Sequence, residues 1–128
     1  VFRPTWADAE RLEHTRVCAR LLARLAPDDV APCLSTHTGG WRPWGRDGAF
    51  GAAVRAGLQA ARSALRGLER EVLLALEPEP DSTQESVAEL AAFLDAERRA
   101  AGEAEPERDL LGVCLDTCHA AVLFEDTA

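Results

Sequence analysis

The sequence predicts an α/β fold with parallel strands, and two observations lead to this prediction. Three short apolar runs, at about 32–36, 71–76 and 110–115, have the near-continuous hydrophobicity of strands in a sheet that is covered on both faces. Longer segments with the apolar spacing of amphipathic helices precede and separate these runs. Strands that alternate with helices in this way form β-α-β units, in which the strands run parallel.

Three helical stripes can be traced in chain order. They consist of Leu12, Thr15, Ala19, Leu22 and Leu25 in the first, Phe50, Val54, Leu58, Ala61, Leu65 and Leu68 in the second, and Val87, Leu90, Ala91 and Leu94 in the third. The second helix is expected to begin near Asp47 or Gly48, after a loop rich in glycine and tryptophan. The third carries a capping-box signature, with Ser82 as the N-cap and Glu85 reaching back to it. A charged surface connection at 102–107 then leads to the last strand.

The spacing of the strands is compatible with a barrel. The expected strand ends, near residues 37, 77 and 116, recur about every 40 residues. Eight such units would need roughly 300 residues, which is a plausible size for a (β/α)8 barrel. An open, doubly wound sheet has the same local pattern, so the spacing alone leaves both architectures open. No glycine-rich phosphate-binding loop follows any of the three strands.

Charge and composition argue against several classes of function. The net charge of −8 argues against a nucleic-acid-binding protein, because phosphate contacts need a basic surface. No apolar run approaches the roughly 20 residues of a membrane-spanning helix, so no membrane insertion is expected. The four cysteines form no C-x-x-C pair and are interpreted as small buried hydrophobic residues in a reducing cytoplasm.

Two carboxylates at strand ends are the first candidate site residues. Because side chains alternate along a strand, Glu77 and Asp116 fall on the face of each strand that carries the smaller residues. A barrel interior takes modest side chains, so both carboxylates should point inward at the carboxyl ends of the strands. The structural alternative is that each carboxylate only caps its strand or the helix that follows. The occurrence of two at corresponding positions favours a site.

His119 completes a candidate metal site. It follows Asp116 by three residues across a strand-to-helix turn, so both side chains can converge on one ion. Carboxylate oxygens with an imidazole nitrogen suit zinc, manganese, cobalt or iron better than calcium. Magnesium also stays open, because the identity of the metal cannot be read from these residues. The predicted ligands are therefore Glu77, Asp116 and His119.

Two further residues are candidates for binding a substrate. His37 ends the first strand on the same face as Ser35 and would point toward the site, as a ligand or as an acid–base group. Arg42 lies in the loop that follows and could hold an anionic substrate. The alternatives are a solvated loop histidine and an arginine that packs within its turn.

The motifs resemble those of the xylose isomerase-like superfamily. The run Gly112–Ala120 is similar to its D-T-C-H strand and turn, as found in endonuclease IV, where the Asp and His bind zinc. Leu74–Pro78 resembles the preceding unit, whose strand-end Glu is a metal ligand. The chain most resembles a narrower branch, the sugar phosphate isomerase/epimerase-like proteins of Ebo-type metabolite-traffic operons. The stretches that carry this likeness are 1–6, 34–36, 40–42, 74–80 and 112–126.

The resemblance implies a fold and a type of chemistry. It implies an α/β fold in the form of a partial (β/α)8 TIM barrel, with residues 1–128 as the central fragment of a single barrel domain. About three consecutive parallel β/α units would be present, and both chain ends are interpreted as cuts in a longer chain whose further metal ligands lie beyond Ala128. It also implies a cytoplasmic protein with a divalent-metal centre, associated with secondary-metabolite biosynthesis or traffic.

Two classes of function remain open. The first is a metal-dependent isomerase or epimerase of a small sugar-like or polyol substrate, in which Glu77 could act as the base and the metal polarises a carbonyl oxygen. The second is a non-catalytic protein that binds a metabolite. An endonuclease IV-like phosphodiesterase would need more histidines and a basic groove than this acidic chain offers. The unpaired edges of a partial barrel also predict self-association, and hence possible homo-oligomers.

Overall fold

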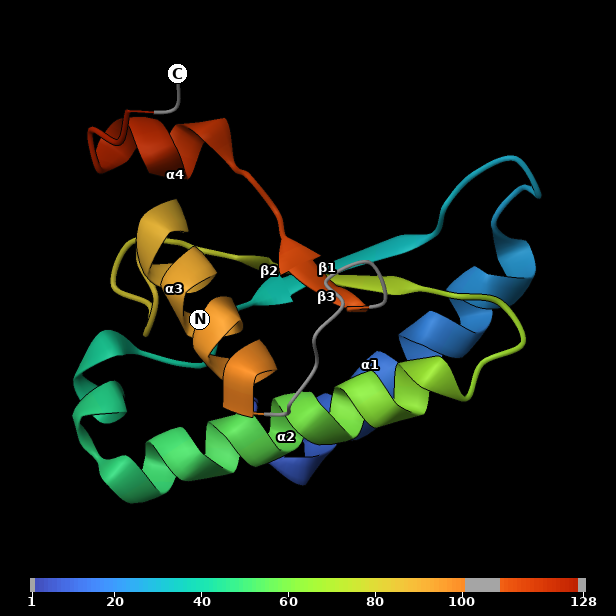
Figure 1. Cartoon of the computed structure of the whole chain (residues 1–128), viewed down its shortest axis with the longest axis horizontal. Helices are drawn as coiled ribbons and strands as arrows, with labels where there is room; N and C mark the ends of the chain where they lie inside the picture. The colour runs from blue at the N-terminus through green and yellow to red at the C-terminus, as the bar shows by residue number, and fades with distance from the viewer. Residues whose placement is uncertain (1, 101–108, 127–128) are drawn as a thin grey trace.

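A computed structural model describes residues 2–100 and 109–126 of the chain. It contains four α-helices, one 3-10 helix and three strands (Figure 1). In chain order these are α1 (Ala9–Leu25), β1 (Cys33–His37), η1 (Arg42–Arg46), α2 (Gly48–Arg66), β2 (Leu73–Glu77), α3 (Val87–Ala100), β3 (Leu111–Val113) and α4 (Thr117–Val122). All three strands therefore lie where the apolar runs predict them. The connection expected at 102–107 lies outside the described residues.

The strands form one parallel sheet in the order β1-β2-β3. Cys33 pairs with Leu73, His37 pairs with Glu77, and Ala75 pairs with Gly112. In this register the carboxyl ends of β1 and β2 are level, and the chain leaving β3 reaches the same edge of the sheet. Residues that end successive strands are therefore neighbours.

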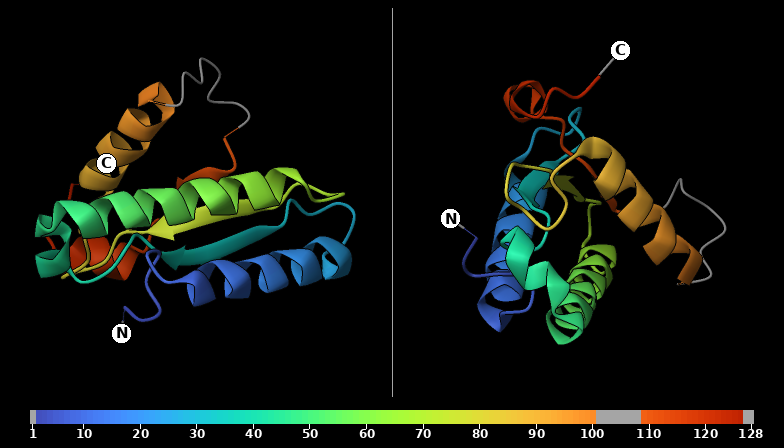
Figure 2. Two further views of the ribbon diagram at one scale, coloured as in Figure 1. Left: turned by 90° about the horizontal axis from the view of Figure 1, so that it is seen from below. Right: turned by 90° about the vertical axis from the view of Figure 1, so that its left-hand side faces the viewer.

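One face of the sheet carries the hydrophobic core. Helices α1, α2 and α3 form an arc along this side, while α4 lies apart from them near the carboxyl ends of the strands (Figures 1 and 2). Leu74 and Leu76 of β2 point into this layer and are fully buried. The other buried apolar residues of the core are Trp6, Ala19, Val54, Leu58, Ala61, Leu65, Val72, Leu90, Leu94, Leu110 and Leu111.

The expected partial TIM barrel is wrong for this chain. The described residues form four α-helices and one open, three-stranded sheet, and 128 residues are too few to show three β/α units in a barrel arrangement. A barrel exists only when its first and last strands also pair, whereas β1 and β3 each pair only with β2 in the described sheet. The spacing of strands and helices is common to open and closed sheets, so it could not distinguish them. The face predicted to be a barrel interior is the uncovered face of this sheet.

The two helix starts predicted from the sequence have different outcomes. Helix α2 begins at Gly48 as expected, with Asp47 as the N-cap whose side chain accepts a hydrogen bond from the amide of Ala49 at 2.9 Å. Helix α3 begins at Val87, five residues after the predicted cap. There the Oγ of Ser86 accepts a hydrogen bond from the amide of Glu89 at 3.1 Å.

The predicted cap, Ser82, belongs instead to the loop that packs against the end of β1. Its side chain is fully buried and donates to the carbonyl oxygen of Gln84 at 2.6 Å. Thr38, which directly follows β1, donates to the Oγ of Ser82 at 3.2 Å. Ser82 has the local sequence signature of a helix cap, but its tertiary contact with Thr38 places it in the loop.

A buried ion-pair cluster ties the start of β3 to the helices. The carboxylate of Asp109 is 1% exposed and lies 3.1 Å from Nε of Arg62 on α2 and 2.7 Å from Nε of Arg98 on α3. Its Oδ1 also accepts the amide of Leu111 at 3.1 Å. Because one side chain holds two helices and a strand, this cluster fixes how α2 and α3 sit against β3.

The N-terminal segment covers the carboxyl end of β1. The ring of Trp6 is 1% exposed, and its Nε1 donates to the carbonyl oxygen of His37 at 3.0 Å. Gly57 of α2 permits this packing, since a Cβ at that position would lie 1.9 Å from the carbonyl oxygen of Trp6. The end of β1 is thus positioned by residues far from it in the sequence.

The predictions for the cysteines and for membrane-spanning helices can both be compared with the structure. The cysteines are not buried as predicted: Cys33 and Cys118 are exposed, Cys18 and Cys114 are half-buried, and all four are free thiols. For Cys33, the reason is that its face of the sheet lacks the cover that a barrel would provide. Among the helices described, none is both long enough and apolar enough to cross a membrane.

Candidate metal centre

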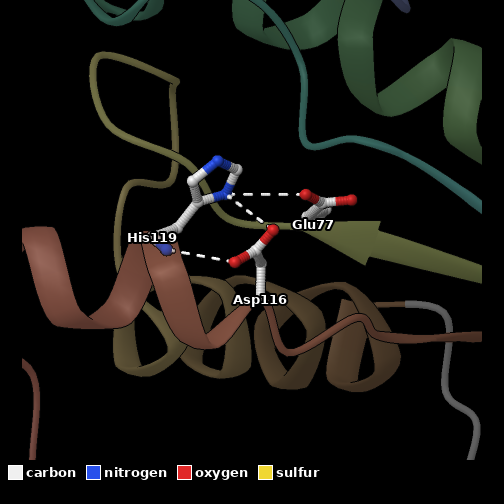
Figure 3. A group of neighbouring side chains, drawn as sticks. All are labelled: Glu77, Asp116 and His119. Carbon is white, nitrogen blue, oxygen red and sulfur yellow. Dashed lines mark hydrogen bonds and ion pairs between the residues drawn. The ribbon is translucent and has the colours of Figure 1, made fainter.

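The carboxyl edge of the sheet brings three predicted site residues together. Glu77 is the last residue of β2, while Asp116 and His119 lie at the start of α4, directly after β3 (Figure 3). One ligand atom from each side chain lies within 4.8 Å of the other two. The parallel register causes this convergence, because it places the end of β2 beside the chain that leaves β3.

The imidazole of His119 lies between the two carboxylates. Its Nδ1 is 3.5 Å from Oε1 of Glu77 and 3.9 Å from Oδ2 of Asp116. All three side chains are about one-third exposed or less, so they are accessible to an ion or a small ligand without being fully solvated. Figure 3 shows the ring edge facing both carboxylates.

Asp116 has a structural role as well as its place in the cluster. Its Oδ1 accepts hydrogen bonds from the amides of Cys118 at 2.7 Å and His119 at 3.1 Å, which makes it the N-cap of α4. These backbone hydrogen bonds, that of His119 first, hold the pKa of Asp116 below its usual value. The group is therefore ionised at neutral pH, with Oδ2 left to face His119.

Glu77 is held by a neighbour on the adjacent strand. The Oγ of Ser35 in β1 donates a hydrogen bond to Oε2 of Glu77 at 2.8 Å. Oε1, the other carboxylate oxygen, is the one that faces His119. Glu77 and Asp116 thus share an arrangement in which one oxygen is anchored by the protein and the other points into the cluster.

The donor set fits a divalent metal ion. The Nδ1 of His119 is shielded from solvent, and no hydrogen-bond partner for it exists within residues 2–100 and 109–126. A buried polar atom without a partner is costly, and a cation placed among the three ligand atoms would remove that cost. Two carboxylate oxygens and one imidazole nitrogen are ligands that zinc, manganese, cobalt and iron accept.

His37 lies beside this cluster without being part of it. It pairs in register with Glu77, but its Nε2 is directed to the carbonyl oxygen of Pro4 at 3.2 Å. A carbonyl only accepts, so Nε2 carries the proton and Nδ1 holds the lone pair. Burial, aided by the nearby charge of Arg11, lowers the pKa of His37 to about 4. The ring is therefore neutral at physiological pH.

Arg42 is engaged away from the three ligands. Its guanidinium forms hydrogen bonds to Glu89 at 2.9 and 3.0 Å and an ion pair with Glu85 at 3.0 Å. These contacts tie η1 to the start of α3. The hydrogen bonds to Glu89 are the main reason that the pKa of Arg42 is raised. Arg42 therefore links η1 to the start of α3, and substrate binding by Arg42 stays a prediction.

Sequence reasoning did not assign a role to Ser35. The alternation of β1 places Ser35 on the same face as His37, which is a signal that the serine is near the site. The hydrogen bond to Glu77, however, spans 42 residues and depends on the register of β1 against β2. The residue pattern of a single strand does not determine how β1 is aligned with β2.

The structure also shows a third carboxylate, that of Glu79, near the cluster. Glu79 follows Glu77 by two residues, and its partial burial raises its pKa. The charge of His119 acts in the opposite direction. Glu79 is therefore close enough to influence the electrostatics of the site, although it is not among the three converging ligands.

Comparisons with known proteins do not place the chain in a family. No family model, no curated protein and no solved structure matches it.

Proposed function

We propose that this chain binds a divalent metal ion through Glu77, Asp116 and His119. We further propose that the metal site catalyses the isomerisation or epimerisation of a small sugar-like or polyol substrate, sugar phosphates included. The observation that supports the metal site most directly is the convergence of three ligand atoms within 4.8 Å of one another. The resemblance of the D-T-C-H and L-E-P segments to metal-dependent isomerases suggests the class of reaction.

Each ligand is prepared for this role by a different part of the fold. The pKa of Asp116 is kept low by backbone amides, so its carboxylate does not need to lose a proton when a metal binds. Oε1 of Glu77 is directed toward the cluster because Oε2 is held by Ser35. His119 presents a shielded nitrogen that has no other partner in the described part of the chain.

The reaction would use the protein groups around the metal. A bound divalent ion supplies Lewis-acid polarisation of a substrate carbonyl or hydroxyl oxygen. Glu77 would be the carboxylate that moves a proton between neighbouring carbons, since Asp116 caps α4 through Oδ1 and its pKa is lowered. His37, neutral and one strand away, would contact a substrate that lies across the ends of β1 and β2.

The two carboxylates and the imidazole define a group of candidate metals. Zinc, manganese, cobalt and iron accept mixed oxygen and nitrogen ligands, and magnesium accepts the carboxylates. Calcium favours six to eight oxygen ligands and is therefore disfavoured at a site with an imidazole. The link to secondary-metabolite biosynthesis or traffic rests on the sequence resemblance alone.

Metal analysis tests the proposal first. The wild-type chain and the double variant Asp116→Ala/His119→Ala would be compared after circular dichroism has shown that both are folded. We expect near-stoichiometric metal in the wild type and a loss of at least ten-fold in affinity in the variant, because two of three ligands are removed. Absence of bound metal in the wild type, after incubation with each candidate ion, would refute the metal site.

A metal-loaded protein then allows the reaction to be tested. Interconversion of sugars, polyols and sugar phosphates would be followed by NMR in deuterated water, where proton transfer incorporates deuterium. Incorporation that disappears in Glu77→Gln supports the isomerase or epimerase. Tight binding of a sugar without turnover would favour the metabolite-binding alternative, in which the same site holds a ligand without converting it.

A further inference from the structure

Ser35 of β1 contacts a proposed metal ligand directly. Its Oγ donates to Oε2 of Glu77 at 2.8 Å. We propose that Ser35 is a positioning residue of the metal centre, which holds the Glu77 carboxylate so that only Oε1 is offered to the ion. This inference rests on the proposed metal-binding function and adds to it a residue outside the set of ligands.

The direction of the hydrogen bond supports this role. A serine hydroxyl that donates to one carboxylate oxygen occupies a lone pair of that oxygen and fixes the rotation of the carboxylate plane. Oε1 then remains 3.5 Å from Nδ1 of His119. Ser35 therefore favours binding through a single oxygen over chelation by both oxygens of Glu77.

Asp116 shows the same arrangement through a different anchor. Two backbone amides hold its Oδ1, while Oδ2 lies 3.9 Å from Nδ1 of His119. Both carboxylates thus have one anchored oxygen and one free oxygen, and both free oxygens face the same nitrogen. In Asp116 the anchor comes from the turn that begins α4, whereas Glu77 ends a strand and depends on its neighbour.

The location of Glu77 explains why an anchor is needed. Its side chain is 27% exposed and lies on the same face of the sheet as the exposed Ser35. Ordering a free glutamate side chain costs conformational entropy. The hydrogen bond from Ser35 orders the side chain before the metal arrives. Groups that orient metal ligands typically contribute about 10- to 100-fold to metal affinity.

A purely structural role for Ser35 would have a different signature. An exposed hydrogen bond between two strands could contribute to the stability of the sheet and leave metal binding unaffected. The two roles are separated by measuring metal affinity and metal-free stability on the same variants. Cys33 provides a matched control, because it lies on the same strand and the same face, is exposed, and is two residues from Ser35.

The test is calorimetric titration of the metal-free chain with Zn²⁺ and with Mn²⁺. We expect Ser35→Ala to weaken metal binding about ten-fold, and Ser35→Thr, which keeps a hydroxyl, to restore the affinity to within about three-fold of the wild type. Cys33→Ala should leave the affinity unchanged. The metal-free melting temperatures of Ser35→Ala and Cys33→Ala should agree closely.

A double-mutant cycle connects the effect to Glu77 itself. In a Glu77→Ala background, Ser35→Ala should produce no further loss of affinity, because the group that it positions is absent. An additional ten-fold loss in that background would overturn the positioning role.

The outcomes also separate this inference from the proposed function. Metal binding by the wild type with equal affinity in Ser35→Ala would overturn the role of Ser35 and leave the metal centre intact. No metal binding by the wild type would overturn both.

Discussion

The two faces of the sheet differ in how their residues are held. On the covered face, Leu74 and Leu76 are fully buried beneath the helices, and their positions follow from packing. On the opposite face, Leu73 is 41% exposed and Ser35 is also exposed, so that hydrogen bonds rather than packing position the polar groups. The candidate site therefore lies on the less covered face, where directed contacts such as the hydrogen bond from Ser35 to Glu77 set its geometry.

Breaking the buried ion pairs of Asp109 should have the largest effect on the stability of the fold. Replacing Asp109 with Asn leaves the two guanidiniums of Arg62 and Arg98 without their shared buried carboxylate. We expect a loss of about 3–5 kcal/mol in the free energy of unfolding, measured by urea denaturation. The control is Asp95→Asn, since Asp95 pairs with Arg98 at the surface with 55% of its side chain exposed, and should cost less than about 1 kcal/mol. Equal losses would show that burial does not distinguish the two carboxylates.

A pair of leucines one residue apart compares the faces directly. Leu74→Ala removes a fully buried side chain, and we expect it to cost about 2–5 kcal/mol. Leu73→Ala removes a side chain that is 41% exposed on the other face, and should cost less than half as much. Thermal or urea unfolding of both variants measures the difference. Similar costs would indicate that the second face is also covered in solution, for example by self-association.

His37, which lies between the carboxyl end of β1 and the N-terminal segment, should make the free energy of unfolding depend on pH. Its pKa is lowered to about 4 in the folded chain from 6.5, so the unfolded chain binds more protons between these values. The stabilisation from the neutral ring is complete above pH 6.5 and is lost as the pH falls toward 4. The shift corresponds to about 3 kcal/mol, and partial exposure of the ring reduces this to about 1–2 kcal/mol.

The measurement for His37 is the free energy of unfolding at several pH values in wild type and His37→Phe. The variant should lose less stability than the wild type between pH 6.5 and pH 4. Parallel profiles would assign the pH dependence to other groups.

The smallest effect should come from the anchor of Asp116. Asp116→Ala removes the acceptor for the amides of Cys118 and His119, and Asp116→Ser keeps an N-cap acceptor while removing the carboxylate. We expect faster hydrogen exchange at those two amides in the Ala variant, and wild-type-like exchange in the Ser variant. Both variants should bind metal less well. Exchange that is unchanged in Asp116→Ala would show that the cap does not order the start of α4.

Local patterns in the sequence predicted much of the candidate site. The apolar runs located the strands, and Glu77 ends β2 as predicted, whereas β3 ends at Val113 and Asp116 caps α4. The D-x-x-H spacing across a strand-to-helix turn then brought His119 beside Asp116. These features depend on residues that are close in sequence, and side-chain periodicity determines them.

Other predictions failed where long-range contacts compete with local signals. Ser82 has the signature of a helix cap but is buried against Thr38, so α3 begins later. Arg42, the candidate substrate-binding residue, is held by Glu85 and Glu89, which lie more than 40 residues away in the sequence. In both cases, partners distant in the chain decided the outcome.

Short-range periodicity in the sequence predicts the three strands, the helices between them, the parallel β-α-β order and the place of Glu77 at the end of β2. Only the tertiary structure decided that the sheet is open, that Ser35 meets Glu77, and that Asp109 joins Arg62 to Arg98. The physical reason is that these contacts depend on strand neighbours and register, and on the packing of helices against the sheet. Such relations join distant segments, and no local pattern of residues encodes them.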